Sequence, residues 1–312
     1  MREITGFKAK WHIFIVLLII VILTAALSAI ATDKENDSIS DTGFNQTEKI
    51  LAMSPNFQDN CLHIFFIDVG QGDSALIESS GHYLLIDAGD NDHGEKVVSL
   101  LKDFGVSRLD YVIATHPHID HIGGLDTVID TFDIETIIMP PVGHNTGSFR
   151  ELLDAINRKE LEITSPLVGT DYKLGAAAFT IITPVSSYGE NLNNWSVGIK
   201  LIFGETAFIL CGDIEKEAEA DIIADSGDLA ADVLKISHHG CNNSTSDEFL
   251  RAVDPTYAII SCGADNPYAY PDEETLTKLA DAGITLYRTD IDGTIICTSN
   301  GSFLTWTTLK KK

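Results

Sequence analysis

Basic residues are scarce in this 312-residue sequence, which has 21 Lys and Arg against 46 Asp and Glu and a formal net charge of −25 at pH 7. Such an excess of acid argues against tight, non-specific binding to nucleic acid, because a negative surface repels the phosphate backbone. It leaves open a local basic groove, or phosphate contacts made through metal ions. The charge is also typical of a soluble exported or salt-adapted protein.

Cysteine is scarce too, and its spacing excludes two common kinds of site. The five cysteines are Cys61, Cys211, Cys241, Cys262 and Cys297, and no two of them form a C-x-x-C pair. We therefore predict neither a disulfide framework nor a structural zinc site with a shell of thiolates. Cys211, Cys262 and Cys297 lie in apolar, strand-like runs and are predicted to be buried small hydrophobes.

Long hydrophobic runs are absent except at the N-terminus, where residues 11–32 are uncharged and residues 13–23 are almost wholly aliphatic. Basic residues precede this run and acidic residues follow it. The pattern predicts a transmembrane helix in residues 1–32, with the rest of the chain outside the cytoplasm. Ala29-Ile30-Ala31 also matches a signal-peptide cleavage site, so secretion after cleavage near Ala31 is the alternative.

Residues 33–60 are rich in polar and acidic residues and predict a flexible linker. From residue 61 to 310 short apolar segments alternate with candidate helices, which predicts a layered α/β domain with substantial sheets. The expected strands are 62–69, 74–78, 83–86, 111–114, 136–139, 179–182, 197–203, 207–210, 233–236, 257–261 and 295–298. The expected helices are about 94–104, 148–158, 215–224, 247–252 and 273–282.

The most informative stretch is 115–124, Thr-His-Pro-His-Ile-Asp-His-Ile-Gly-Gly, which follows a predicted strand at 111–114. Side chains alternate in an extended segment, so His116 and His118 are expected to point the same way and hold one ion. Asp120 and His121 follow where the glycines let the chain turn, and they could hold a second ion. Imidazole with carboxylate suits zinc, and also manganese or iron. The alternative is an ordinary polar surface loop.

Three further polar clusters close strand-like runs in the same way. They are residues 68–74 (Asp-Val-Gly-Gln-Gly-Asp-Ser), Asp213 after a predicted strand, and His238-His239-Gly240 after another. Taken singly these signals are weak, because Asp213 could equally be a helix N-cap and a pair of histidines often lies on the surface. Together they supply the ligands that a two-metal site still lacks.

In this order the motifs resemble the metallo-β-lactamase superfamily, and within it the ComEC-type hydrolase domain, which is found on competence DNA-uptake channels and as stand-alone proteins. The resemblance spans about residues 62–308. It is carried by residues 68–74, 86–89 (Ile-Asp-Ala-Gly), 116–121, 193–196 (Asn-Asn-Trp-Ser), 211–214 (Cys-Gly-Asp-Ile) and 232–240 (Asp-Val-Leu-Lys-Ile-Ser-His-His-Gly).

The resemblance implies a four-layer αββα sandwich with two divalent metal ions at one edge, zinc first and manganese as the alternative. The implied metal ligands are His116 and His118 on the first ion, Asp120, His121 and His239 on the second, and Asp213 between them. It implies that His238 contacts the substrate phosphate or supports a ligand. Asp87 would be a buried carboxylate that orients the histidine loop.

The sequence departs from the superfamily pattern at three places. Where many members have a further histidine on the first ion, this chain offers Asn193, Asn194 or Ser196, as ComEC-type domains do. Cys241 stands where this branch usually has serine, and Tyr270 stands where a histidine is expected.

Two cations about 3.5–4 Å apart can lower the pKa of a bridging water and stabilise charge on a phosphoryl oxygen. The expected activity is therefore extracytoplasmic, metal-dependent phosphodiester hydrolysis by a metal-bridging hydroxide, with Asp120 orienting it and His238 steadying the leaving oxygen. The expected substrate is nucleic acid, including single-stranded DNA, or a phosphorylated envelope component. For nucleic acid we expect a basic cluster near the metals, for which Lys200, Lys235 and Arg288 are candidates.

Two other functions stay open on the sequence alone. One is hydrolysis of a β-lactam or of another acyl or thioester substrate. The other is a non-catalytic metal-binding protein that keeps the fold. A single candidate span cannot form the channel to which ComEC-type domains are attached, and no protein partner can be inferred. The membrane contact expected is the N-terminal helix itself.

Overall fold

The computed structural model describes residues 60–225 and 227–310. The predicted membrane helix at residues 1–32, and the predicted linker up to residue 59, lie outside the described residues, so both stay predictions. Within the described ranges, none of the helices combines the length and the apolar character that a membrane crossing needs.

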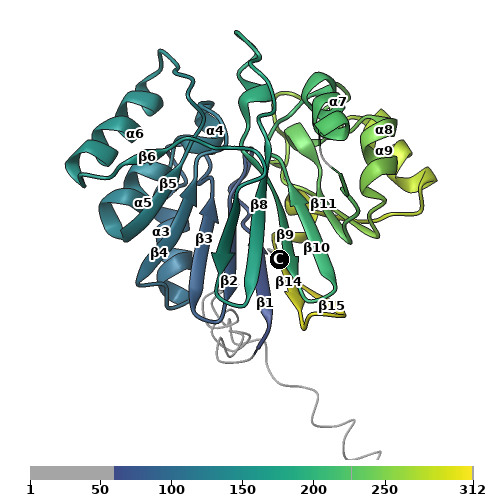
Figure 1. Cartoon of the computed structure of the whole chain (residues 1–312), viewed down its shortest axis with the longest axis horizontal. Coiled ribbons are helices and arrows are strands. Elements are labelled where there is room, and N and C mark those ends of the chain that lie inside the picture. The colour runs from purple at the N-terminus through teal and green to yellow at the C-terminus, as the bar shows by residue number, and fades with distance from the viewer. Residues whose placement is uncertain (1–59, 226, 311–312) are drawn as a thin grey trace, which may run out of the picture. The chain divides into compact units, whose positions relative to one another are not determined.

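Two β-sheets form the centre of the described domain (Figure 1). The first sheet has the strand order β15-β14-β1-β2-β3-β4-β5-β6, and the second has the order β13-β12-β11-β10-β9-β8-β7. The strands of the first sheet are β1 (Leu62–Phe66), β2 (Ala75–Ser79), β3 (His82–Ile86), β4 (Arg108–Ile113), β5 (Asp133–Ile138), β6 (Ile163–Thr164), β14 (Thr294–Ser299) and β15 (Leu304–Leu309). Those of the second are β7 (Asp171–Leu174), β8 (Ala177–Thr183), β9 (Gly198–Phe203), β10 (Thr206–Leu210), β11 (Val233–Lys235), β12 (Tyr257–Ile260) and β13 (Thr285–Arg288).

The sheets pack face to face because their inner strands are apolar on both faces. Ile64, Leu84 and Ile113 from the first sheet are fully buried against Phe179 and Phe208 from the second. Strands buried on both sides read as continuous hydrophobic runs. For this reason the sequence reveals them clearly.

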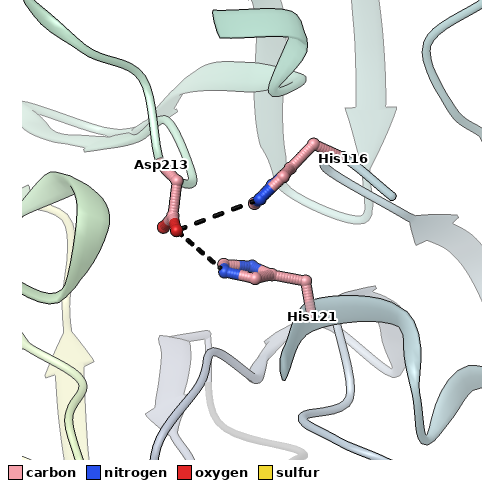
Figure 2. Close-up of side chains that lie close together, drawn as sticks. All are labelled: His116, His121 and Asp213. Carbon is pink, nitrogen blue, oxygen red and sulfur yellow. Dashed lines mark ion pairs between the residues drawn. The ribbon is translucent and has the colours of Figure 1, made fainter. Parts of the chain in front are cut away.

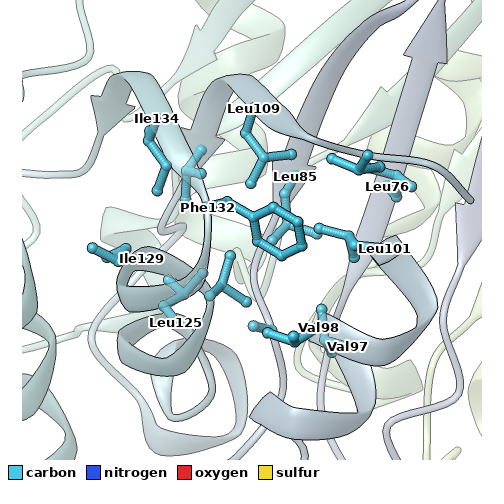
Figure 3. Close-up of a cluster of buried hydrophobic side chains, with 14 of the residues drawn as sticks. Leu76, Leu85, Val97, Val98, Leu101, Leu109, Leu125, Ile129, Phe132 and Ile134 are labelled. Carbon is cyan, nitrogen blue, oxygen red and sulfur yellow. The ribbon is translucent and has the colours of Figure 1, made fainter. Parts of the chain in front are cut away.

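Helices cover the outer face of each sheet, which gives the four layers that the resemblance implies (Figure 1). The helices are α3 (Gly94–Asp103), α4 (Ile119–Ile122), α5 (Leu125–Thr131), α6 (Gly147–Arg158), α7 (Lys216–Asp225), α8 (Asp247–Val253), α9 (Glu273–Asp281) and α10 (Thr289–Asp292). Figure 3 shows Val97 and Leu101 of α3 packed with Leu125 and Ile129 of α5 beneath the first sheet. Ile222 of α7 and other apolar residues of α7, α8 and α9 pack on the outer face of the second sheet.

Several predicted elements need correction. The strand predicted at 62–69 ends at Phe66, and the segment after it is a loop. Strands β6, β7, β13 and β15 were not predicted, because they are short or half-exposed and lack an apolar run. Helices α4 and α5 were not predicted either, since Gly123-Gly124 reads as a break between elements.

The strand directions bring the polar clusters to one edge. Strands β3, β4 and β5 are parallel in the first sheet, and β10, β11 and β12 are parallel in the second. Loops that follow parallel strands leave the sheet at the same edge, which is where open α/β sheets bind ligands. The segments after β3, β4, β10 and β11 carry the candidate site residues.

Candidate metal centre

The loop after β4 places His116 and His118 side by side, although not in the way expected. The chain bends at 116–117 instead of staying extended, and Asp120 and His121 belong to the short helix α4. The two rings still converge, with 3.0 Å between His116 Nε2 and His118 Nδ1. At this distance one neutral ring can donate a hydrogen bond to the other, and the same convergence of two ring nitrogens suits two ligands of one cation.

Asp213, in the segment between β10 and α7, is the centre of the cluster. Its Oδ2 lies 3.2 Å from His121 Nε2 and 3.9 Å from His116 Nε2, and Figure 2 shows both rings directed at this carboxylate. His239 Nε2 lies 3.4 Å from the same oxygen and 3.2 Å from Asp120 Oδ2. The structure thus brings together all six of the predicted metal ligands from three segments of the chain, which follow β4, β10 and β11.

Each buried ring is fixed through its second nitrogen. His116 Nδ1 lies 3.1 Å from Thr115 Oγ1, His121 Nδ1 lies 2.8 Å from Asp87 Oδ2, and His239 Nδ1 donates to the Ser261 carbonyl at 2.9 Å. This leaves the Nε2 atoms for the shared centre, as in histidines that bind metals.

The donor set fits divalent cations. His121 Nε2, His239 Nε2 and Asp213 Oδ1 are buried and make no hydrogen bond of acceptable geometry. Two ligand groups, His116 with His121 and Asp213, and Asp120 with His121 and His239, each have ligand atoms within 4.8 Å of one another. His118 is outside both groups and is partly exposed at their rim. Imidazole and carboxylate donors in this number suit zinc or manganese and leave positions open to a substrate.

The buried histidines and carboxylates of the cluster shift one another's pKa values. Burial alone would lower the pKa of His121, but the carboxylates of Asp213, Asp87 and Asp120 raise it well above its usual value. Burial opposes ionisation of Asp213, and the imidazoles of His121 and His239 nevertheless hold its pKa well below the usual range. The pKa of His116 is well below its usual value because of burial and the charge of His121, so this ring is neutral, the form that binds metals.

Asp87 lies behind the histidines, as the resemblance implies. It is fully buried and accepts hydrogen bonds from the Thr115 backbone N–H at 2.8 Å and from Thr115 Oγ1 at 2.6 Å, besides its contact with His121. Burial raises the pKa of Asp87, while these contacts lower it. Its φ of 56° is uncommon for a residue other than glycine.

The segment 193–196 stands near the first ligand group but supports it indirectly. Ser196 Oγ lies 3.2 Å from His116 Nδ1 and accepts from the Asp213 backbone N–H at 3.1 Å. Asn193 donates to the Glu215 carboxylate at 3.0 Å, and Asn194 accepts from the Glu215 backbone N–H at 2.8 Å. These residues therefore fix the segments that carry the ligands.

His238 lies apart from its neighbour His239 and faces a pocket of about 290 Å³ above the cluster. Its Nε2 is 4.0 Å from Asp213 Oδ2, and its Nδ1 is 3.1 Å from Asn243 Oδ1. Both histidines have a positive φ, 52° and 55°. Such strained backbone clusters at functional sites, and here it turns the two adjacent rings in different directions.

Asp73, from the polar cluster 68–74, and Lys235, a candidate basic residue, form a buried ion pair that the sequence does not predict. Lys235 Nζ lies 2.8 Å from Asp73 Oδ2, while Asp73 Oδ1 lies 3.5 Å from His239 Nδ1. Burial raises the pKa of Asp73, but Lys235 and His239 lower it to about 2. The sequence feature that could have identified Asp73 is its position between a two-glycine turn and a buried strand.

The three candidates for a basic cluster do not gather at the site. Lys235 is buried with Asp73, Lys200 pairs with Asp228 at 3.4 Å, and Arg288 Nη2 pairs with Asp290 at 2.6 Å. Among the described residues, those lining the pocket include no lysine or arginine. The expected basic cluster is therefore not found among the residues that line this pocket.

With this geometry in place, residues 67–264 match the metallo-beta-lactamase superfamily domain, and the chain belongs to that superfamily. It is 31% identical over 247 residues to ComE operon protein 3 of Bacillus subtilis, covering 73% of this chain and 32% of that protein. It is 29% identical over 230 residues to competence protein ComA of Neisseria gonorrhoeae, covering 73% of this chain and 31% of that protein. The chain thus spans about a third of the length of these relatives, which are ComEC-type competence proteins.

Among solved structures, the chain is similar to CmlA, a diiron beta-hydroxylase from Streptomyces venezuelae, with a TM-score of 0.49 and 14% identity, covering 73% of this chain and 52% of that one. The superfamily to which the chain belongs and its cluster of candidate ligands both indicate a metal-dependent hydrolase.

Proposed function

We propose that the chain is a metal-dependent phosphodiesterase that acts on nucleic acid, with single-stranded DNA as its substrate. The observation that carries the proposal is the convergence of three imidazoles, those of His116, His121 and His239, on the Asp213 carboxylate beneath an open pocket. The second carboxylate, that of Asp120, lies against His239 at the same place. The names of the competence relatives favour DNA over a phosphorylated envelope component.

The chain's own residues would divide the work as follows. His116, His118, Asp120, His121, Asp213 and His239 would hold two divalent ions, zinc or manganese. Ions held there would supply a nucleophile from water at neutral pH and neutralise charge on the phosphate.

Two side chains would act on the substrate directly. Asp120 Oδ2, 3.2 Å from His239 Nε2, would accept a proton or hydrogen bond at the pocket floor. His238, oriented by Asn243, would present Nε2 to a phosphate or leaving oxygen.

The test is turnover of bis-p-nitrophenyl phosphate and single-stranded DNA by the 312-residue chain with added zinc or manganese. His116→Ala and Asp213→Ala should each lower the turnover rate by more than about 10–100-fold. A loss of about 10–100-fold is typical when a residue that only supports a metal ligand is removed. His82→Ala and Asp228→Ala are matched controls, because these residues pair with Asp110 and Lys200 outside the cluster. The proposal would be refuted if His116→Ala and Asp213→Ala cut both phosphodiesters as fast as the two control variants do. Hydrolysis of a β-lactam or thioester in place of the phosphodiesters would also refute it.

We also propose that the catalytic domain faces the outside of the cytoplasm, held by the hydrophobic segment at residues 1–32. The hydropathy and flanking charges of that segment support this orientation. Protease added to intact cells should degrade the domain, whereas protection until the membrane is broken would contradict it. Release of the domain into the medium would indicate cleavage near Ala31.

A further inference from the structure

The pocket above the metal centre has one wall made of two tyrosines. Tyr268 and Tyr270 stack with ring centroids 5.5 Å apart and an angle of 19° between their planes. Tyr270 also packs edge-on against His238, with centroids 5.7 Å apart. A pair of aromatic rings thus extends from a side chain at the reacting centre to the pocket mouth.

Tyr268 is the outer ring and is 61% exposed. Large hydrophobic side chains are seldom this open among the described residues, yet Ile119, 51% exposed, lines the same pocket. Exposed apolar surface beside a candidate catalytic centre is a mark of ligand contact. Tyr268 therefore combines a stacking contact with Tyr270 and a largely exposed side chain that a ligand can contact.

The loop that presents these rings is held in shape by a single amide. Asn266 Oδ1 accepts from the backbone N–H groups of Tyr268 and Tyr270 at 3.2 and 3.0 Å. Its Nδ2 donates to the carbonyls of Gly263 and Tyr270 at 2.9 and 2.7 Å. Four hydrogen bonds to one side chain fix the loop before any ligand arrives, which lowers the entropic cost of binding.

Charge on the pocket wall cannot provide the affinity for a polyanion. Lysine and arginine are missing from the described residues around the pocket, and the acidic side chains of Asp120 and Asp213 lie at its floor. Phosphate groups away from the metals would find no cation to pair with. Beyond the one phosphate at the metals, affinity for a nucleic-acid strand within this pocket would therefore come from its bases, and an unpaired base can stack on an aromatic ring.

We infer that Tyr268, backed by Tyr270, is a stacking platform for an unpaired base beside the scissile phosphate and determines specificity for single strands. The inference rests on the proposed phosphodiesterase function, and it names the part of the substrate that the site recognises. Base-paired DNA cannot offer a free base face, so a duplex is excluded from the platform.

The experiment compares two substrates that differ only in their bases. One is a fluorescein-labelled oligothymidylate of eight nucleotides, and the other has the same phosphates with abasic tetrahydrofuran residues. KM and kcat are measured with the whole metal-loaded chain. Binding is measured by anisotropy with phosphorothioate versions of both strands, which resist cleavage.

Tyr268→Ala should raise KM and Kd for oligothymidylate about five- to a hundredfold, the range for losing one stacked base, with kcat little changed. Both constants for the abasic strand should stay the same. Tyr268→Phe should behave like the wild type, because the ring is kept. Phe303→Ala is the control, since Phe303 is an exposed aromatic outside the pocket.

Equal effects of Tyr268→Ala on both strands, or no effect on either, would overturn the platform. Failure of the proposed function looks different: neither strand would be cut by the wild type. In that case the anisotropy measurement still decides the inference. Tighter binding of the strand with bases by the wild type, lost in Tyr268→Ala, supports the platform. Equal binding of both strands refutes it.

Discussion

Asp87 shows how a residue that is not itself a predicted metal ligand can control the metal centre. It is fully buried at the end of β3 and its carboxylate holds both His121 and Thr115. Thr115 in turn contacts His116, so one carboxylate fixes a histidine of each ligand group.

We predict that Asp87→Asn folds but lowers metal affinity and phosphodiesterase activity by about 10–100-fold. The amide keeps one acceptor oxygen and tolerates the positive φ, but it loses the charge that orients the His121 ring. Isothermal titration with zinc measures the affinity, and thermal unfolding of the metal-free chain checks the fold. Asp90→Asn, a partly exposed carboxylate paired with His93, is the control. Unchanged affinity in Asp87→Asn would show that the contact is only structural.

At the scale of elements, the junction of α4 and α5 depends on close backbone packing. A Cβ on Gly124 would lie 2.4 Å from the Ala88 carbonyl oxygen and 2.8 Å from Gly94 Cα, and neither of these backbone atoms can move aside easily. The contact sets helix α4, and with it Asp120 and His121, against the loop after β3.

We predict that Gly124→Ala destabilises the fold by about 1–3 kcal/mol, the cost of overpacking a tight contact. Gly147→Ala is the matched control, because Gly147 begins α6 and its Cβ would meet nothing within 4 Å. Alanine favours a helix over glycine, so the control should be neutral or slightly stabilising. Urea unfolding measures both, and equal stability of the two variants would contradict the account.

The same junction shows where prediction from sequence succeeds and where it stops. Buried strands such as β1 and β12 are visible as apolar runs, and the motifs identify the candidate ligands that the fold brings together, because metal chemistry restricts residue types. Helix α4 was missed because a glycine pair reads as a turn, although its real role is close packing. Tyr268 gave no signal, since only the folded loop brings it to the pocket.

At the scale of the whole molecule, the acidic net charge, together with a pocket whose described lining has no lysine or arginine, makes a distinctive prediction. A protein that binds six phosphates through lysine and arginine loses about a thousandfold or more in affinity between 50 and 200 mM salt. Here a net charge of −25 repels the substrate, and salt screens that repulsion. We therefore expect kcat/KM for an oligothymidylate to stay constant or rise over this range at fixed metal concentration. A steep fall would indicate a basic surface outside the described pocket.

The central claim is that Asp213, Asp120 and the four histidines would together hold two metal ions, and that the second ion would be lost without Asp213. The measurement that tests it most directly is metal content per chain, by plasma mass spectrometry, after loading with zinc or manganese and desalting. We predict two ions per wild-type chain and at most one in Asp213→Ala, with phosphodiesterase turnover lost in parallel. Two ions retained by Asp213→Ala, or turnover by a wild-type chain that holds none, would contradict the claim.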